Sequence, residues 1–529
     1  MTRLLPRNRV LRWTLICLII ISLLSVLALW SWGRFARSAQ GEPSHALPVA
    51  SAATTLDRLV QPLLDRHDDD SSGAAFLGDP ELALKARVLT ARKAERSLDV
   101  QYYIWSHDTT GQLLQHELMN AADRGVRVRM LIDDVNLAGR DDELLAMAAH
   151  PKVEIRLFNP ARNRDSTIRR AVEMGLRFIG FNRRMHNKAW IADNRMAIVG
   201  GRNIADHYFG ADDETNYRDT DLLLIGPAVA QTSSIFDEFW NSTEVIPLRA
   251  LHEEGSRWSR AKLKRRRRQW LENARATDWV SAVDEHDDLQ DKLLGDELVL
   301  HWSPSIRVLS DPPKKAAPLA NQRDRAGWLM YDVMALLYST KHRSWLISPY
   351  FVPGSNGTLL LAGQVRRAMT VRVLTNSLAA TNVPMVHAGY ARYRKQLLAQ
   401  GVELYELKPG DDDPDRELIP SSRSTLHSKA FVIDGRRGFV GSFNLDPRSA
   451  QLNTEMGVMF DDPGLAQELT RYFRDSIRPE NAWHVILTDD DELRWLGTKG
   501  FTWEQEPETG LGLRVLVRLL GLLPIESQL

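Results

Sequence analysis

Along much of the chain, short apolar runs of strand length alternate with longer stretches in which apolar residues recur at the period of a helix. Apolar runs of strand length occupy 98–105, 126–134 and 153–160, and stretches with apolar residues at the helical period lie between them at 111–125 and 140–150. Strands that alternate with helices of this length form a parallel or mixed sheet flanked by helices. This part of the chain is therefore predicted to be an α/β domain.

The same order of elements returns later in the chain. Leu98 corresponds to Trp345 and Val126 to Val371, at offsets of 247 and 245 residues. A solenoid would repeat every 20–50 residues or so, which makes two long copies a duplicated domain instead. The strand-like runs of the second copy are 344–353, 371–377 and 402–409.

These patterns predict six parts, of which the second is a Ser-, Ala-, Pro- and Asp-rich tether with one short helix around Leu56–Leu64. The parts are a membrane anchor or signal segment at 1–36, the tether at 37–78, a first domain at 79–245, a charged connecting region at 246–325, a second domain at 326–485, and a C-terminal tail with an amphipathic segment at 486–529.

Two of these parts carry an open alternative. The basic run KLKRRRRQW at 262–270 is expected to be a solvated helix face, with contact to anionic lipid headgroups as the alternative. The apolar stripe of the C-terminal tail is too short to span a membrane, so it either packs on the domain or lies in the membrane interface.

Residues 13–32 form an uncharged stretch with tryptophans at both ends. As a helix, twenty residues cover about 30 Å, the thickness of the hydrocarbon core of a bilayer. An uncleaved anchor is favoured over a signal peptide, whose apolar region is about 7–15 residues long, although small residues near Ala36 and Ser38 could form a cleavage site. Four arginines precede the stretch and two follow it, which predicts that the rest of the chain lies across the membrane from the short N-terminus.

Charge and cysteine content exclude several classes of function. The chain has 68 basic and 68 acidic residues, but six of the basic ones lie in the first 40 residues, which leaves a formal charge of −6 on the rest. A mildly acidic body argues against a general nucleic-acid binder. Cys17 is the single cysteine, so an intramolecular disulfide or a cysteine-rich metal site is impossible.

One motif occurs at the same place in both copies. HNKAWIAD at 186–193 is followed by GGRN at 200–203, and HSKAFVID at 427–434 is followed by GSFN at 441–444. Counted from the histidine, Lys stands at +2, Asp at +7, Gly at +14 and Asn at +17 in both. A lone histidine on a strand is usually a core residue, but two complete copies at matching positions indicate a functional site.

The spacing of the motif suggests its chemistry. His and Lys two residues apart leave the same face of a strand, and small residues at the end of the return strand let a ligand approach the backbone. An imidazole, an ammonium and an amide from each half suit a phosphoryl group, since Lys and Asn can bind its oxygens while the imidazole reaches phosphorus. The residues are His186, Lys188, Gly201 and Asn203 in the first half, and His427, Lys429, Ser442 and Asn444 in the second.

A carboxylate further along each half could orient its imidazole. Asp219 lies 33 residues after His186, and Glu455 lies 28 residues after His427. A carboxylate that accepts from imidazole Nδ1 fixes the tautomer and stabilises the imidazolium. Each acid is expected to serve the histidine of its own half, with Asp221 as the alternative in the first.

These motifs resemble the phospholipase D superfamily, and the wider context, including LDVQYYIW and VGGRNIADHYFG, is similar to bacterial cardiolipin synthases of the C type over roughly residues 75–529. The resemblance implies two pseudo-twofold-related domains, a ping-pong mechanism through a phosphohistidine, and no metal or other cofactor. It assigns His186 as nucleophile, His427 as acid/base, and Asp193 and Asp434 as structural residues. Gly201 departs from the family, in which this position often holds Ser.

The expected function is transfer of a phosphatidyl group to make cardiolipin from phosphatidylglycerol and a second phospholipid, with phosphatidylethanolamine as a candidate partner substrate. The expected location is the bacterial inner membrane, with the catalytic domains in the periplasm and no nucleic-acid partner; an accessory protein is not identified by the sequence. A phospholipase D-type hydrolase, a nuclease and a non-catalytic lipid-binding protein are the alternatives.

Several other residues have two interpretations. His387 is either a residue at a helix start or a contact to a lipid headgroup. Core packing is favoured over a place in the substrate cleft for four residues, which are His207, Tyr208, Tyr350 and Phe351.

Overall fold

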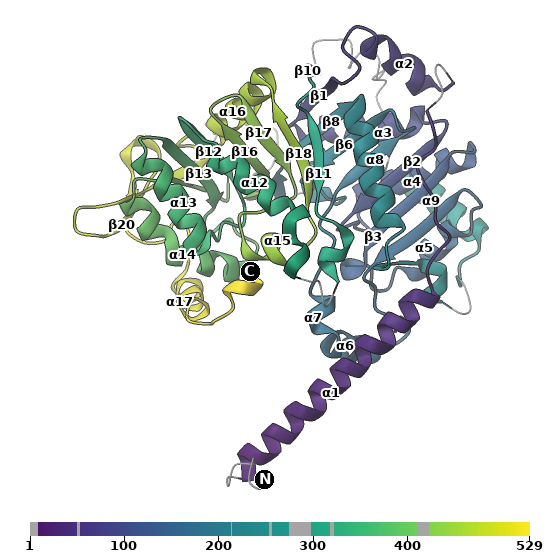
Figure 1. Ribbon diagram of the computed structural model, residues 1–529, viewed down its shortest axis with the longest axis horizontal. Helices are drawn as coiled ribbons and strands as arrows, with labels where there is room; N and C mark the ends of the chain where they lie inside the picture. Colours follow the sequence, from purple (N-terminus) through teal and green to yellow (C-terminus); the bar gives the residue numbers. More distant parts are fainter. Residues whose placement is uncertain are drawn as a thin grey trace.

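Two mixed β-sheets, one from each half of the chain, form the framework of the computed structural model (Figure 1). The structure describes residues 9–49, 53–212, 214–252, 256–274, 298–317, 322–410 and 423–529. Both sheets carry helices, and one long helix, α1 (Arg9–Ser38), projects from the body with the N-terminus at its far end.

The strand order of the first sheet is β10-β1-β8-β6-β5-β2-β3-β4-β9. In chain order its strands are β1 (Ser72–Leu77), β2 (Ser97–Tyr102), β3 (Arg127–Asp133), β4 (Val153–Phe158), β5 (Ala189–Ala192), β6 (Met196–Gly200), β8 (Asp221–Ile225), β9 (Val245–Pro247) and β10 (His301–Ser303). Strands β2, β3 and β4 are parallel and their other neighbours are antiparallel.

The strand order of the second sheet is β11-β18-β17-β16-β12-β13-β14-β19-β20-β21. In chain order its strands are β11 (Arg307–Ser310), β12 (Arg343–Ile347), β13 (Thr370–Asn376), β14 (Glu403–Leu407), β16 (Lys429–Ile433), β17 (Arg437–Gly441), β18 (Met456–Asp461), β19 (Ala482–Leu487), β20 (Leu493–Leu496) and β21 (Thr502–Trp503). The order from β11 to β19 repeats that from β1 to β9, which confirms the predicted duplication.

The helices follow the same repeat. In the first half they are α3 (Pro80–Lys93), α4 (Thr109–Asp123), α5 (Asp141–Ala148) and α8 (Pro227–Trp240), and in the second α12 (Leu329–Tyr338), α13 (Gly354–Arg366), α14 (Pro384–Ala399) and α16 (Pro463–Ser476). Helices outside this repeat are α2 (Thr55–Leu64), α6 (Thr167–Leu176), α7 (Phe178–Phe181), α9 (Arg260–Ala274), α15 (Pro447–Gln451) and α17 (Leu511–Leu520). Single 3₁₀ turns occupy Asp134–Asn136, Asp206–Tyr208, Leu248–Leu251, Pro313–Ala316, Gln322–Gly327, Thr498–Gly500 and Glu526–Gln528.

A shared hydrophobic core joins the two halves. It contains the apolar faces of α8 and α16 together with side chains from both sheets, such as Val199 and Val440. Burial of apolar surface between the halves stabilises their relative position. A small parallel pair, β7 (Thr215–Arg218) with β15 (Arg423–Leu426), also joins one half to the other.

The predicted tether is wrong for most of residues 53–77. Thr54 caps α2, whose Leu56 and Val60 are fully buried, and β1 pairs with β8 inside the first sheet. The strand SGAAFL is missed because small residues after an acidic turn give no clear alternation. The short helix expected around Leu56–Leu64 is confirmed as α2.

The connecting region also contributes to the fold more than its charge suggests. Its strands β10 and β11 extend one sheet each, while residues 253–255, 275–297 and 318–321 lie outside the described residues. The basic run lies on α9, where Leu263 is buried against the first domain and Lys264, Arg265, Arg266 and Arg268 are exposed, as a solvated helix face requires.

Among the described residues, α1 is the helix long and apolar enough to cross a membrane, with a mean hydropathy of 2.5 over its best window. Its C-terminal turns are different, because Trp32 and Ala36 are buried against Ile246 of β9. Helix α1 therefore ends in direct contact with the first domain.

Candidate active site

The two motif histidines lie where the halves exchange backbone hydrogen bonds. His186 precedes β5 and its N–H donates to Thr454 O over 2.8 Å. His427 precedes β16 and its N–H donates to Arg218 O, also over 2.8 Å. Because Glu455 follows Thr454, His186 is held beside Glu455. Because Asp219 follows Arg218, His427 is held beside Asp219.

The carboxylates consequently serve the opposite halves. His186 Nδ1 lies 2.8 Å from Glu455 Oε2, and His427 Nδ1 lies 2.6 Å from Asp219 Oδ2. The expectation that each acid serves its own half is therefore wrong. Sequence distance favours a partner in the same half, but the cross-half backbone pairs bring the acid of the other half closer.

The alternative acid in the first half, Asp221, has a structural place. Its carboxylate lies 2.8 Å from the guanidinium of Arg87 and 3.4 Å from that of Arg202, and all three side chains are buried. Asp221 thus neutralises core arginines and does not contact either histidine.

Hydrogen bonds define the tautomer of His186. Its Nδ1 faces two acceptors, Glu455 Oε2 and the carbonyl of Ser442 at 3.1 Å, so Nδ1 carries the proton. Nε2 of the neutral ring then holds a lone pair, and no hydrogen bond within the described residues reaches it. This nitrogen is available to attack an electrophile.

Burial keeps the His186 imidazole neutral and its partner charged. Burial lowers the pKa of His186 to about 4, and the carboxylate of Glu455 opposes this shift only in part. Burial alone would raise the pKa of Glu455, but the contacts with His186, Lys188 and Ser442 lower it. We therefore describe the pair as a neutral imidazole beside a carboxylate.

His427 is in a more cationic environment. Burial lowers its pKa well below the usual 6.5, and the charges of Lys429, Lys188 and His186 add to this effect. Burial likewise raises the pKa of its partner Asp219. Charges from both halves act on one ring, so the two motifs form a single site.

The motif lysines are fully buried beside the histidines. Lys188 Nζ donates to the His186 carbonyl over 2.5 Å, and Lys429 Nζ donates to the His427 carbonyl. Burial lowers the pKa of Lys188 to about 7 and that of Lys429 to about 8. An anion placed between them would restore their full charge, which is the behaviour expected of a phosphate-binding pair.

The two asparagines follow the small residues at the ends of β6 and β17. Asn203 Oδ1 accepts from the backbone N–H of Ile104 over 3.1 Å, whereas the buried Oδ1 of Asn444 has no hydrogen-bond partner among the described residues. Both amides are almost fully buried within the site.

The small residues at position +15 support the acids. Ser442 Oγ donates to Glu455 Oε2 over 2.5 Å. At the equivalent Gly201, an added Cβ would clash with the Asp219 carboxylate. Gly201 therefore leaves space for the Asp219 carboxylate. The equivalent residue in the second half, Ser442, instead binds the Glu455 carboxylate through its hydroxyl.

The motif aspartates lie at the other end of their strands. Asp193 and Asp434 adopt left-handed backbone conformations with φ of 53° and 58°. Asp193 accepts the N–H groups of residues 95–97, and Asp434 accepts those of residues 341–343. Each carboxylate thus fixes the loop that leads into the strand paired with its motif strand, which is β2 beside β5 and β12 beside β16.

Three tyrosines surround the histidine rings. Tyr103 packs edge-on against His186 with ring centroids 5.1 Å apart, and Tyr217 stacks on His427 at 5.5 Å. Tyr208 packs edge-on against His427, and its hydroxyl lies 3.3 Å from His427 Nε2. The prediction that Tyr208 is a core residue is therefore only part of its role, because it also contacts His427. Its position five residues after the motif Asn203 is the feature of the sequence that indicates this contact.

The remaining candidates lie outside the immediate site. His387 is buried in α14, where it contacts Arg394 and Glu506, so it does not face a headgroup. His207 packs against Tyr208 and Tyr217. Phe351 belongs to the core of the second domain, and the Tyr350 hydroxyl donates to Asn382 over 2.9 Å.

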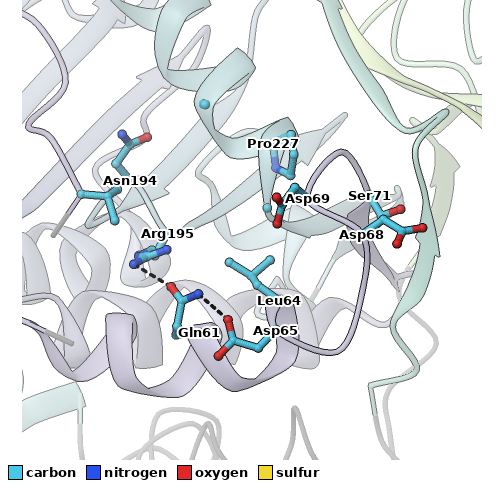
Figure 2. A pocket seen from close by; sticks show the side chains of 12 residues that line it. Gln61, Leu64, Asp65, Asp68, Asp69, Ser71, Asn194, Arg195 and Pro227 are labelled. Atoms are coloured by element: carbon cyan, nitrogen blue, oxygen red, sulfur yellow. Dashed lines mark hydrogen bonds between the residues drawn. The ribbon is translucent and has the colours of Figure 1, made fainter. Parts of the chain in front are cut away.

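A cavity of about 330 Å³ beside α2 is separate from the histidines. Figure 2 shows its lining, in which Arg195 donates to Gln61 and Gln61 donates to Asp65. Asn194 and Arg195 follow Asp193, so this cavity lies at the turn of the motif and not at its catalytic end. Over the described ranges, no group of three or more His, Cys, Asp or Glu residues is arranged to hold a metal ion.

The sequence also matches a known family. The family "Cardiolipin synthase, PLD-like domain" matches residues 89–240 and 333–477, one segment in each half. The chain belongs to this family. The predicted membership in the phospholipase D superfamily and the duplicated α/β fold are both confirmed.

Within the family, the chain is 40% identical over 453 residues to cardiolipin synthase C of Escherichia coli (strain K12), covering 84% of this chain and 93% of that protein. It is 26% identical over 460 residues to a cardiolipin synthase of Geobacillus kaustophilus (strain HTA426), covering 86% and 75%. The crystal structure of a phosphatidylserine synthase from Haemophilus influenzae Rd KW20 shares the fold, with a TM-score of 0.55 at 14% identity, covering 90% of this chain and all of that one.

The altered pKa values predict the pH range of the first catalytic step of this enzyme. A phosphatidyl donor with a nitrophenolate leaving group needs no proton from the enzyme, so its kcat/KM reports free His186 and the lysines. The neutral form of His186 is lost only as pH falls through about 4, and the Lys188 ammonium is lost as pH rises through about 7. We expect a bell with limbs near these values, measured by nitrophenol absorbance at its isosbestic wavelength.

A matched variant identifies the alkaline limb. Lys188→Arg keeps a positive charge at every pH used, so in the active variant the limb should move toward the higher pKa of Lys429, about 8. An acid limb near the ordinary histidine value of about 6.5 would contradict the assignment of a neutral, buried nucleophile.

Proposed function

We propose that the protein is a cardiolipin synthase, a phosphatidyltransferase that acts through a phosphohistidine. The observation that carries the proposal is the cross-half arrangement, in which two buried imidazoles are each oriented by a carboxylate from the other half and are flanked by two buried lysines. The names of the relatives support cardiolipin as the product.

In the first step, His186 Nε2 attacks the phosphorus of a donor phospholipid. A nitrogen–phosphorus bond forms, the bond from phosphorus to the headgroup oxygen breaks, and protonated His427 gives its proton to that oxygen. Lys188, Lys429 and the motif asparagines would bind the non-bridging oxygens, where negative charge accumulates. The bound phosphodiester anion favours the protonated state that His427 needs for this step.

In the second step, His427 is neutral and takes the proton of a glycerol hydroxyl of phosphatidylglycerol. The hydroxyl oxygen attacks phosphorus, the nitrogen–phosphorus bond breaks, and cardiolipin and neutral His186 result. Two displacements at one phosphorus allow an alcohol to replace water as the acceptor.

An asymmetry between the halves supports these roles. Ile104 N–H fixes Asn203, whose Nδ2 donates to Tyr208 Oη over 2.8 Å, so the Tyr208 hydroxyl is free to donate to Nε2 of neutral His427. The equivalent of Tyr208 in the second half is Ser449, which binds Glu455 over 2.8 Å. His427 thus has a hydrogen-bonded Nε2, suited to proton exchange, while Nε2 of His186 is open.

We also propose an uncleaved anchor with the catalytic domains in the periplasm. Packing supports the first part, since Trp32 is buried in the first domain and the Arg177 guanidinium lies 3.6 Å from its ring centre. The arginine asymmetry around residues 13–32 supports the second part.

The test of the function is lipid mass spectrometry on a cardiolipin-free bacterial host that expresses the chain. We expect new cardiolipin that disappears in the His186→Ala variant, and comparison of hosts with and without phosphatidylethanolamine identifies the second substrate. Phosphatidic acid without cardiolipin in both hosts would overturn the proposal in favour of a hydrolase.

The roles of the histidines can be separated by trapping the intermediate. With the nitrophenolate donor, His427→Ala should still accept the phosphatidyl group and then retain it, because no base activates the incoming alcohol. His186→Ala should form no adduct. The measurement is intact mass after quenching in base, and an adduct on His427 in the His186→Ala protein would reverse the roles.

Removal of the Tyr208 hydroxyl should affect only the step that needs His427. Tyr208→Phe should leave nitrophenol release unchanged and slow cardiolipin formation by roughly tenfold to a hundredfold, which is at or below the roughly hundredfold minimum usual for a general acid–base group itself. The matched control is Tyr217→Phe, which keeps the ring stacked on His427 and loses a hydroxyl directed at Asn382. Equal slowing of both reactions would indicate a general structural effect instead.

A further inference from the structure

Exposed apolar side chains gather beside the point where α1 enters the body. Ile168 and Val172 on α6 and Phe178 and Ile179 on α7 are all more than half exposed, with Ile168 at 77%. In Figure 1, α6 and α7 lie beneath the first sheet, beside α1. Four exposed apolar side chains on two neighbouring helices form a patch of the kind that marks an interaction surface.

The contact between α6 and α1 indicates how deep this patch would lie if α1 crossed a membrane. A groove of about 400 Å³ separates the two helices, lined by Ala28 and Trp32 of α1 and by Ile168 and Val172 of α6. Trp30 and Trp32 end the apolar stretch of α1, and tryptophans at such positions lie at the membrane–water interface. The apolar side of α6 is therefore at the level of the lipid headgroups when α1 spans the bilayer.

A second apolar patch lies on α17 and the turn that follows it. Val517 packs against Leu378 and Ala388, while Leu511, Leu519 and Leu522 are 58% to 79% exposed. This helix carries arginines and no acidic residue, and it lies along the same lower edge of the molecule as α7 in Figure 1. Exposed leucines with arginines are typical of a helix that lies in the membrane interface.

Each patch is connected to one of the catalytic histidines. Only four residues separate the end of α7 from His186, a reach of at most about 18 Å. The C-terminal Leu529 packs in a cluster with Tyr350, whose hydroxyl bonds to Asn382. Asn382 in turn donates to Tyr217, the ring stacked on His427.

The two patches are also joined to each other. Asn182, directly after α7, donates to Gln528 over 2.8 Å, and Arg448 bonds to both residues. These bonds fix the segment that follows α7 beside the C-terminal segment that follows α17.

We propose that α6–α7 and α17 are two interfacial elements that dock the catalytic body on the bilayer crossed by α1. Continuity with α1 favours a bilayer over a second copy of the chain. So does charge, because the guanidinium groups of the exposed Arg162, Arg169 and Arg518 form no salt bridge within the described part of the chain and suit anionic headgroups. The docked body would hold the histidines beside the lipids that they use, a consequence that rests on the proposed function.

Depth-dependent quenching of the full chain in vesicles tests the docking. Cys17 is the only cysteine, so Cys17→Ser provides a background for single probes at Val172, Ile179 and Leu519. Vesicles of phosphatidylglycerol and phosphatidylethanolamine with nitroxide-labelled lipids should quench all three probes, and aqueous iodide should not. The control probe is at Val299, which is 53% exposed and lies two residues before β10 in the sequence. Figure 1 shows β10 at the end of the body away from α1.

Each outcome of the quenching experiment either supports or overturns the proposed docking. Quenching by lipid at all three positions but not at Val299 supports the proposal. Iodide access at α6–α7 or at α17 overturns it, and so does protection from both quenchers, which would mean that a second copy covers the face. No outcome depends on activity, so a failure of the proposed function is seen separately as a lack of cardiolipin.

An activity split then tests the consequence for catalysis. Phe178→Asp with Leu519→Asp should lower cardiolipin formation on vesicles by about tenfold or more, because charges weaken interfacial insertion. The same variant should act normally on short-chain phosphatidylglycerol below its micelle concentration, and Val299→Asp should be normal on both. Equal loss on both substrates would show that the face acts through folding and not through docking.

Discussion

The exchange of carboxylates between the halves is the interaction on which the active site depends. His186 is oriented by Glu455 and His427 by Asp219, and each pair is fixed by a backbone hydrogen bond across the same interface. Neither half alone contains a complete imidazole–carboxylate pair. The shared core between the sheets is thus a catalytic requirement as well as a source of stability, since separation of the halves would leave buried ionisable groups without partners.

Burial then gives the site its electrostatic state. Both histidines and both lysines lose proton affinity in the absence of substrate because the site has few water contacts and an excess of cationic groups. A phosphodiester anion is the ligand that relieves this state, because it pairs with the ammonium groups and favours protonation of one imidazole. In the proposed mechanism, the affinity of the site for phosphate and the attack by neutral His186 therefore have the same physical origin.

The sequence is a good guide to whatever is local and periodic in this protein. The paired motifs, the repeated succession of strands and helices along the chain, and the small residues at position +15 can be predicted from the sequence, because strand alternation and fixed spacings act over a few residues. The pairing of Asp219 and of Glu455 with the histidine of the opposite half cannot be predicted from the sequence, since it depends on how the two domains pack together. Strand β1 is missed because its pattern of apolar and polar residues is weak. The role of the Tyr208 hydroxyl is missed because it depends on a contact with the other half.

The duplicated halves differ at two positions that decide how one symmetric framework can perform an asymmetric reaction. Gly201 leaves space for the shorter Asp219, whereas Ser442 donates to Glu455, so one histidine has an acid held by a hydroxyl and the other does not. Tyr208 reaches His427 Nε2, whereas the equivalent Ser449 turns to Glu455. The hydroxyl groups of the second half thus stabilise the carboxylate beside His186, and the hydroxyl of the first half contacts the reactive nitrogen of His427. In the mechanism proposed above, the nucleophile His186 needs a fixed acid and an open nitrogen, while the proton-transfer group His427 needs a hydrogen-bonded nitrogen. The two differences between the halves fit these proposed roles.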